Sequence, residues 1–145
     1  KINKSPDDSG LTRGPPPPPS EIRKCVMIVE DDEAVRTLLI RAFEGVGHDL
    51  VVARSGEEAL EYWREAGDAI DAVITDVIMP NLSGPRLVEK LRESRPQLPV
   101  VYISGYASDR VGRDTMRDAN TVFMQKPFDL HSLIAKLDAL LEGGA

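Results

Sequence analysis

The sequence predicts an α/β fold of the doubly wound class, in which a parallel five-stranded sheet is covered by helices on both faces. Two observations predict this fold. Five short apolar runs alternate along the chain with segments whose apolar residues recur at helical spacing. The apolar runs are also nearly continuous, without regular polar interruptions, which is typical of strands that are buried on both faces.

The predicted strands and helices alternate along the chain. The strands cover, in chain order, residues 25–29, 50–53, 70–76, 98–103 and 121–125. Asp32 is expected to cap the first helix, and Ser55 with Glu58 forms a capping box for the second. Pro85 suits the first turn of the third helix, and Asp129 is expected to cap the last one.

Two segments differ from this pattern. Residues 108–119 offer few apolar side chains, so the helix expected there should be short or mobile. Residues 1–22 are almost without apolar side chains and include a run of five prolines, which predicts a disordered proline-rich linker. The folded domain is then expected over residues 23–145. Because the chain begins with Lys1 and not with methionine, we expect it to be part of a longer protein.

The composition describes a soluble globular chain. With 145 residues, 41% hydrophobic and 29% charged, a single domain with an apolar core is expected. No apolar stretch approaches the ~20 residues that span a bilayer, so this domain is expected to make no membrane contact. A net charge of −6 without a basic cluster argues against direct binding of nucleic acid.

The cysteine and histidine content adds little chemistry. Cys25 is the single cysteine and cannot form an internal disulfide, which fits a cytoplasmic location. Its apolar neighbours predict a buried, inert thiol. We interpret His48 and His131 as helix-surface or loop residues without partners.

Charged and polar side chains stand where the predicted strands end. Glu30 and Asp31 come directly after the first strand, and Asp76 closes the third. Ser104 follows the fourth strand, and Lys126 follows the fifth. Because ligands of parallel sheets bind outside the carboxyl ends of the strands, we expect these side chains to form one site. A buried charge is costly unless a partner or a metal compensates it, so packing explains Asp76 poorly.

The expected chemistry is phosphoryl transfer assisted by a metal. Three carboxylates brought together would repel one another unless a hard cation lay among them, and Mg²⁺ prefers such oxygen ligands. A carboxylate can attack a phosphoryl group, while Lys126 and Ser104 hold its oxygens. Taken singly, Glu30 and Asp31 could be solvated acids, Lys126 a surface lysine and Ser104 a turn residue. Their shared position at strand ends favours a site.

Together these residues resemble the receiver domain of two-component response regulators. The resemblance covers residues 24–142. Its elements are the acidic cluster after the first strand with Arg36, Asp76 followed by Met79-Pro80 and Gly84, Ser104 with Gly105, and Lys126-Pro127-Phe128. Each element is common by itself, but the combination is specific to this family.

The resemblance implies a flavodoxin-like sheet with strand order 2-1-3-4-5 and a role in a phosphorelay. Asp76 is then the acceptor of a phosphoryl group, and the donor is the phosphohistidine of a histidine kinase or a histidine phosphotransfer protein. The resemblance also implies Mg²⁺ held by Asp31, Asp76 and the backbone carbonyl of Ile78, with Glu30 acting through water. The oligomeric state stays open.

Further expectations concern conformation and lifetime. The resemblance implies that Ser104 and Phe123 form a switch pair, in which the ring follows the hydroxyl inward on phosphorylation. It also implies a cis peptide bond at Lys126-Pro127. Ile78 and Tyr106 stand where other receivers carry groups that orient the attacking water, so we expect slow self-dephosphorylation.

The run Ile103-Ser104-Gly105-Tyr106 is similar to receivers of hybrid sensor histidine kinases, and the proline-rich linker agrees. The domain itself would catalyse only its own phosphorylation and dephosphorylation. The alternatives are a stand-alone single-domain response regulator and a pseudo-receiver that binds partners without phosphorylation. A haloacid dehalogenase-type phosphatase would need a second acid where Ile78 stands, and a nucleotide or flavin binder would need a glycine-rich loop after the first strand.

Overall fold

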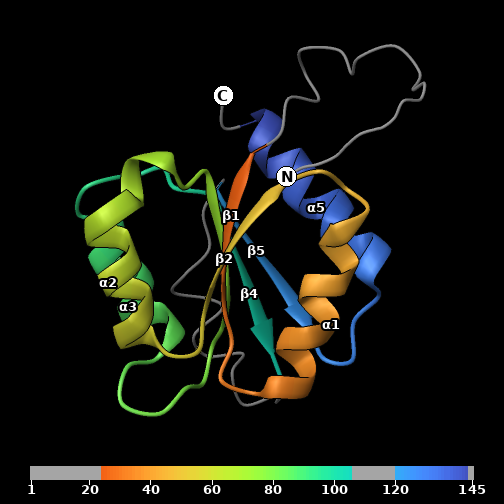
Figure 1. Ribbon diagram of the computed structural model, residues 1–145, viewed down its shortest axis with the longest axis horizontal. Helices are drawn as coiled ribbons and strands as arrows, with labels where there is room; N and C mark the ends of the chain where they lie inside the picture. Colours follow the sequence, from red (N-terminus) through yellow and green to blue (C-terminus); the bar gives the residue numbers. More distant parts are fainter. Residues whose placement is uncertain (1–23, 106–119, 144–145) are drawn as a thin grey trace, which may run out of the picture.

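A computed structural model describes residues 24–105 and 120–143 and contains a five-stranded parallel sheet between two layers of helices (Figure 1). The strand order is β2-β1-β3-β4-β5 with every pair parallel, which confirms the predicted fold and topology. The strands are β1 Cys25–Val29, β2 Asp49–Ala53, β3 Ala72–Asp76, β4 Val100–Ser104 and β5 Thr121–Gln125. The linker expected over residues 1–22 and the weak helix expected over 108–119 lie outside the described residues.

Four α-helices and one short 3₁₀ helix are described around the sheet. They are α1 Glu33–Glu44, α2 Gly56–Ala66, η2 Gly67–Ala69, α3 Gly84–Leu91 and α5 Leu130–Gly143. Helices α1 and α5 cover one face of the sheet, and α2 and α3 cover the other (Figure 1). Among the described residues, no helix combines the length and the apolar character needed to cross a membrane.

The first two helices begin at the predicted caps. The Asp32 carboxylate accepts hydrogen bonds from two backbone amides in the first turn of α1. The Ser55 hydroxyl accepts one from the Glu58 amide at 3.1 Å. The Glu58 carboxylate, however, accepts from the amide of Arg54 at 2.7 Å and not from that of Ser55. Only one of the two hydrogen bonds of the capping box is therefore formed. The second bond, from the Glu58 carboxylate back to the chain, goes to the amide one residue before Ser55.

The other two helices also carry side-chain caps. Pro85 lies in the first turn of α3, as predicted, and Ser83 caps this helix without having been predicted to do so. Asp129 accepts hydrogen bonds from the amide of His131 and the hydroxyl of Ser132, which confirms it as the cap of α5. Short polar side chains thus fix the start of each helix.

Three strands begin at other residues than predicted. The second strand was expected from residue 50 and the third from residue 70, but β2 begins at Asp49 and β3 at Ala72. The fourth strand was expected over residues 98–103, but β4 begins at Val100, so Leu98 and Pro99 precede it. Pro99 has no amide proton and cannot donate to a neighbouring strand, although its carbonyl accepts from the Val73 amide at 3.0 Å. Leu98 is buried beside the sheet without being part of it.

The core has two layers because successive strand residues point to opposite faces of the sheet. On the face of α2 and α3 the buried strand residues include Met27, Val73 and Tyr102. On the face of α1 and α5 they include Ile28, Ile74 and Ile103. The apolar residues of the strands therefore divide between two separate layers.

The prediction that His48 lacks partners is wrong. Its Nδ1 accepts a hydrogen bond from the Lys24 amide at 3.2 Å, and its Nε2 lies 3.3 Å from Oδ1 of Asp138 on α5. Because Nδ1 is an acceptor, the ring proton is on Nε2 and points to the carboxylate. The side chain is only 10% exposed. His48 therefore joins the start of β1 to the last helix.

Cys25 is half-buried at the start of β1, so the predicted burial of its thiol is found only in part. Burial raises the pKa of the thiol, and the negative charges of Asp49 and Asp71 raise it further. A raised pKa disfavours the thiolate, which is the nucleophilic form. The prediction of low reactivity agrees with these surroundings.

Candidate functional site

Three strands end in the charged residues that the sequence marks as a site. Glu30 follows β1 directly and is fully buried, Asp76 is the last residue of β3 and is 7% exposed, and Lys126 follows β5. Two residues before each of them, the strand carries an apolar residue of the α1–α5 layer: Ile28, Ile74 and Met124. The alternation of the strands therefore directs all three charged groups to the same side of the sheet.

Lys126 pairs with both buried acids. Its Nζ lies 3.2 Å from Oδ2 of Asp76 and 3.5 Å from Oε1 of Glu30. Burial lowers the pKa of Lys126, but the carboxylates of Glu30 and Asp76 outweigh that effect and hold the pKa above its ordinary value. A fixed positive charge therefore lies beside Asp76. The Lys126-Pro127 peptide bond is cis, which confirms that prediction.

The surroundings of Glu30 disfavour the charged form of its carboxyl group. Its Oε2 accepts a hydrogen bond from the Asp32 amide at 3.1 Å, whereas its buried Oε1 has no hydrogen-bond partner within the described part of the chain. Burial, followed by the charge of Asp76, raises the pKa of Glu30 to about 8, although the Asp32 amide and Lys126 act in the opposite direction. The Lys126 ammonium group lies 3.5 Å from Oε1 of Glu30 without forming a hydrogen bond, so a metal cation, or water bound to one, could satisfy this oxygen more closely.

The acids form a compact oxygen cluster. Glu30, Asp31 and Asp76 each offer one carboxylate oxygen, and these oxygens all lie within 4.8 Å of one another. Asp31 is exposed while the other two are buried, so the cluster is open to solvent on one side. Only oxygen ligands are present, which fits a hard divalent cation such as Mg²⁺.

The two residues expected to form a switch lie on neighbouring strands, Ser104 on β4 and Phe123 on β5. Ser104 ends β4, is fully buried and follows Ile103, the residue paired with Asp76 in the sheet register. Phe123 pairs with Tyr102 in the register, and the two rings stack with centroids 5.0 Å apart. Because Tyr102 belongs to the α2–α3 layer, Phe123 packs on that face. The structure thus keeps the ring of Phe123 on the face opposite to Lys126 and Asp76.

The loop after β3 carries Ile78, whose side chain is 53% exposed. Its backbone carbonyl as a metal ligand stays a prediction. Tyr106, the second residue expected to affect dephosphorylation, lies outside the described residues. Ile78 is therefore an exposed apolar residue two positions after Asp76.

Two residues hold the backbone of the site, and neither had a role that the sequence predicts. Nη1 of Arg36, on α1, donates to the carbonyl of Glu30 at 2.9 Å. Gly84, at the start of α3, packs against the carbonyl of Asp76. The signal for Arg36 was its place six residues after Glu30, one helical turn inside α1, from which a long side chain can fold back to the loop.

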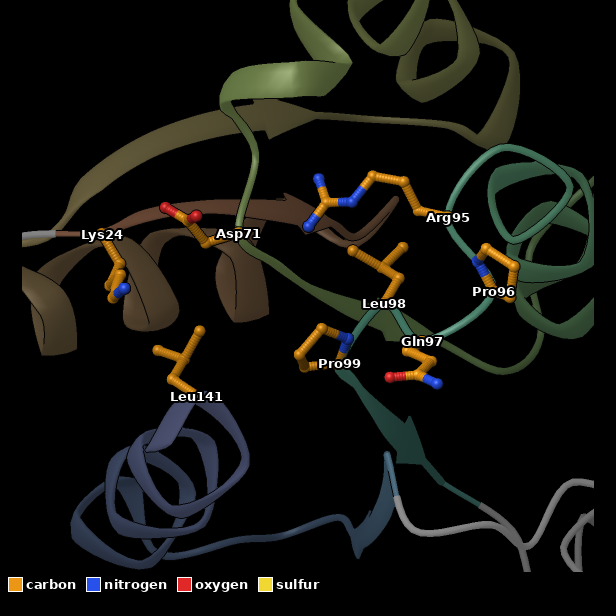
Figure 2. Close-up of a pocket in the computed structure, with 8 residues that line it drawn as sticks. All are labelled: Lys24, Asp71, Arg95, Pro96, Gln97, Leu98, Pro99 and Leu141. Atoms are coloured by element: carbon orange, nitrogen blue, oxygen red, sulfur yellow. The ribbon is translucent and has the colours of Figure 1, made fainter. Parts of the chain in front are cut away.

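A pocket of about 440 Å³ lies at the opposite end of the sheet (Figure 2). Its lining includes Lys24 and Asp71, which precede β1 and β3, together with Pro99 before β4. Leu141 of α5 closes one side, as Figure 2 shows. None of the carboxylates of the acidic cluster lines this pocket, so the chemistry of the strand ends lies elsewhere.

Comparison with known proteins decides the family. A sequence model of the response regulator receiver domain matches residues 26–138. The chain belongs to this family. The domain is therefore a receiver of two-component signalling systems, and the flavodoxin-like topology and the resemblance seen in its sequence are both confirmed.

Curated relatives include longer proteins. The receiver domain is 40% identical over 117 residues to the sensor kinase CckA of Brucella abortus, a match that covers 81% of this chain and 12% of that protein. It is 37% identical over 119 residues to the response regulator MprA of Mycolicibacterium vanbaalenii, covering 80% of this chain and 49% of that protein. The chain thus spans less than half the length of either relative.

Solved receiver domains have the same architecture. The crystal structure of the receiver domain from the hybrid histidine kinase CckA superposes with a TM-score of 0.68 at 34% identity, covering 81% of this chain and 98% of that one. A receiver domain protein from Clostridium thermocellum gives a TM-score of 0.77 at 21% identity, covering 83% of this chain and 95% of that one. At 21% identity, the similarity to the second structure supports only a shared fold.

Proposed function

We propose that Asp76 is the phosphoacceptor of this receiver domain and takes a phosphoryl group from a phosphohistidine in a reaction that requires Mg²⁺. The observation that carries the proposal is the contact between Asp76 and Lys126 at 3.2 Å inside the acidic cluster. The Asp76 carboxylate thereby lies beside a positive charge and close to two further carboxylate groups. This arrangement suits a group that must receive an anionic phosphoryl group.

The proposed step is a single displacement at phosphorus. A carboxylate oxygen of Asp76 attacks, the P–N bond to the donor imidazole breaks, and the imidazole leaves with the electron pair. The ammonium group of Lys126 holds one oxygen of the transferred group, and the hydroxyl of Ser104 donates to another. The product is an acyl phosphate on Asp76.

The acidic cluster fits Mg²⁺ by its oxygen ligands and by the buried Glu30 Oε1 that lacks a hydrogen bond among the described residues. Asp31, Asp76 and the carbonyl of Ile78 would hold the ion directly, and Glu30 would act through water. When bound, the ion would neutralise charge on the phosphoryl oxygens. Asp31 contributes the solvent-exposed side of this ligand set.

The conformational response is proposed to pass through Ser104 and Phe123. Movement of the Ser104 hydroxyl toward the phosphoryl group would leave space that the Phe123 ring fills, which requires the stack with Tyr102 to rearrange. Ser104→Ala should still be phosphorylated but should show no change in the NMR signals of the Phe123 ring. A full shift of those signals in the variant would contradict this switch.

The phosphoacceptor proposal is tested by intact mass. The domain is incubated with acetyl phosphate and Mg²⁺, and one phosphoryl adduct, labile in acid and base, is expected on the wild type. Asp76→Asn should stay unlabelled, because the amide is similar in shape but cannot attack phosphorus. Asp68→Asn, which changes an exposed acid in η2, serves as the control and should be labelled as the wild type is. Labelling of Asp76→Asn would refute the assignment, and an unlabelled wild type would favour a pseudo-receiver.

We also propose that the domain is part of a hybrid histidine kinase in the cytoplasm. The 40% identity to the sensor kinase CckA of Brucella abortus supports this context, and a free thiol at Cys25 fits a reducing compartment. The phosphodonor is then a histidine kinase or a histidine phosphotransfer protein. The adjoining coding sequence tests the context: a histidine kinase core ahead of the proline run is expected, and a coding sequence without one would overturn it.

A further inference from the structure

The carbonyl of Glu30 needs a hydrogen-bond donor that is not an amide of the sheet. The Glu30 amide donates to the Ala53 carbonyl at 3.1 Å, but β2 ends at Ala53. In the parallel register the amide that would face this carbonyl belongs to Ser55, which lies beyond the end of β2 and caps α2. A buried carbonyl without a donor is costly, and Arg36 supplies the donor from α1 at 2.9 Å. Arg36 therefore continues the hydrogen bonding of β1 beyond the end of β2.

The loop between β1 and α1 is fixed at three points. Arg36 holds the Glu30 carbonyl, the Glu30 carboxylate holds the Asp32 amide, and the Asp32 carboxylate caps α1. Asp31 lies between these anchors with an exposed side chain. Within the described residues no hydrogen bond to the Asp31 carboxylate is found, so the place of this carboxylate in the cluster depends on the loop around it.

The choice of a carbonyl as partner has an electrostatic consequence. Arg36 carries a permanent positive charge, yet its bond to a carbonyl leaves the carboxylates of the cluster free to bind a cation. A guanidinium paired with Asp31 would instead compete with the metal for the same oxygen. The positive charge of Arg36 thus lies near the acidic cluster while its hydrogen bond goes to a backbone carbonyl.

We propose that Arg36 is a positioning residue for the metal site: its hydrogen bond to the Glu30 carbonyl sets the β1–α1 loop so that the Asp31 carboxylate stays among the ligand oxygens. The proposal rests on the proposed function in one respect, namely that the acidic cluster binds Mg²⁺. Residues that orient metal ligands typically contribute 10- to 100-fold to metal affinity. Loss of Arg36 should therefore weaken Mg²⁺ binding without removing a ligand.

The test is a calorimetric titration of the unphosphorylated domain with MgCl₂. Arg36→Met should bind Mg²⁺ about tenfold more weakly than the wild type. The matched control is Arg41→Met, which removes the same charge from an exposed site on the same helix and should leave the affinity unchanged. Arg36→Lys keeps the charge and can donate to the same carbonyl, so it should recover most of the lost affinity.

A kinetic measurement separates positioning from general damage. With acetyl phosphate as donor, Arg36→Met should need about tenfold more Mg²⁺ for half-maximal labelling but reach the wild-type rate at saturation. Equal Mg²⁺ affinity of Arg36→Met and wild type overturns the proposal, and so does an equal loss in Arg41→Met. If Arg36→Met does not fold, Arg36→Gln replaces it, because its amide is too short to reach the carbonyl. A wild type that binds no Mg²⁺ would instead refute the proposed function.

Discussion

Gly84 lies directly against the backbone of Asp76, and a Cβ at this position would overlap the carbonyl oxygen of Asp76. The Gly84 amide also donates to the Val77 carbonyl at 2.8 Å. The start of α3 is thereby packed onto the strand end that carries the proposed phosphoacceptor. Any side chain at position 84 must move one of these two backbone segments.

Gly84→Ala should therefore destabilise the domain and disturb phosphorylation at the same time. Overpacking of this kind costs about 2 kcal/mol, and the displaced atom belongs to Asp76 itself. Chemical denaturation and the rate of labelling by acetyl phosphate would measure the two effects. The control is Gly45→Ala, since a Cβ at Gly45 meets nothing within 4 Å. If Gly84→Ala is as stable as the wild type, the backbone at Asp76 and Gly84 can shift at little cost, which would contradict this prediction.

A second prediction concerns pH and Glu30. The pKa of Glu30 in the folded domain is about 8, against an ordinary value of 4.5. Between these values the folded state binds more protons than the unfolded state, so the stability of the metal-free domain should fall as pH rises from 4.5 to 8. Glu30→Gln is neutral throughout and should lose this part of the pH dependence.

Thermal unfolding without Mg²⁺ checks the effect of Glu30. At pH 8 the melting temperature of Glu30→Gln should exceed that of the wild type by about 5 °C, and the difference should shrink toward pH 5. Glu44→Gln alters an exposed glutamate at the end of α1 and should follow the wild type at each pH. A constant difference between Glu30→Gln and wild type at every pH would contradict the assignment.

A third prediction concerns the phosphodonor. Leu38 on α1 and Ile78 after β3 are the large hydrophobic side chains of the described residues that are exposed, each by 53%. Leu38 lies on α1, the helix that begins at the acidic cluster, and Ile78 follows Asp76 by two residues. We therefore expect both side chains to contact a protein that docks at the site. Leu38→Glu should slow transfer from a phosphorylated histidine kinase about tenfold, as expected for the loss of an apolar interface contact.

The small donor acetyl phosphate separates docking from chemistry in this variant. Labelling of Leu38→Glu by acetyl phosphate should equal that of the wild type, because no protein surface is needed. Ala66→Glu places the same charge on α2, on the other face of the sheet, and should not affect transfer from the kinase. Equal slowing with both donors would mean that the substitution damages the site.

A fourth prediction concerns the lifetime of the aspartyl phosphate. Ile78 offers no side-chain hydrogen bond to a water molecule approaching Asp76. Replacement of Ile78 by Asn, combined with Tyr106→Glu, should speed loss of the phosphoryl group about tenfold, because polar side chains can orient the attacking water. Decay is followed by mass after removal of the donor. Equal decay of the double variant and wild type would exclude these positions as the determinant of lifetime.

The sequence predicts those parts of the site that depend on strand ends. Glu30, Asp76 and Lys126 each follow an apolar run, and parallel strands bring such positions together whatever their distance along the chain. The caps Asp32 and Asp129 were predictable because a cap acts within three residues of its own position. Local chemistry and strand topology are thus the features that can be inferred from the sequence.

The features that were missed depend on contacts between distant segments. His48 binds Asp138, 90 residues away, and the backbone amide of Lys24, which leaves no trace in the side-chain pattern. The role of Gly84 depends on the packing of α3 on β3. The role of Arg36 depends on where β2 stops, because that end decides whether the Glu30 carbonyl lacks a partner. Contacts of this kind can be recognised only in the three-dimensional structure.

The alternation of the strands makes the site sensitive to insertions that sequence motifs do not detect. One residue added inside β1 would leave Glu30, Asp31 and Asp32 consecutive, so the motif would look intact. The pleat would nevertheless turn Glu30 from the side of Lys126 and Asp76 toward the face of α2 and α3. A receiver altered in this way would keep every residue of the motif, but Glu30 would no longer pair with Lys126. An odd number of residues inserted into a strand can therefore separate inactive receivers from active ones that share the same motif.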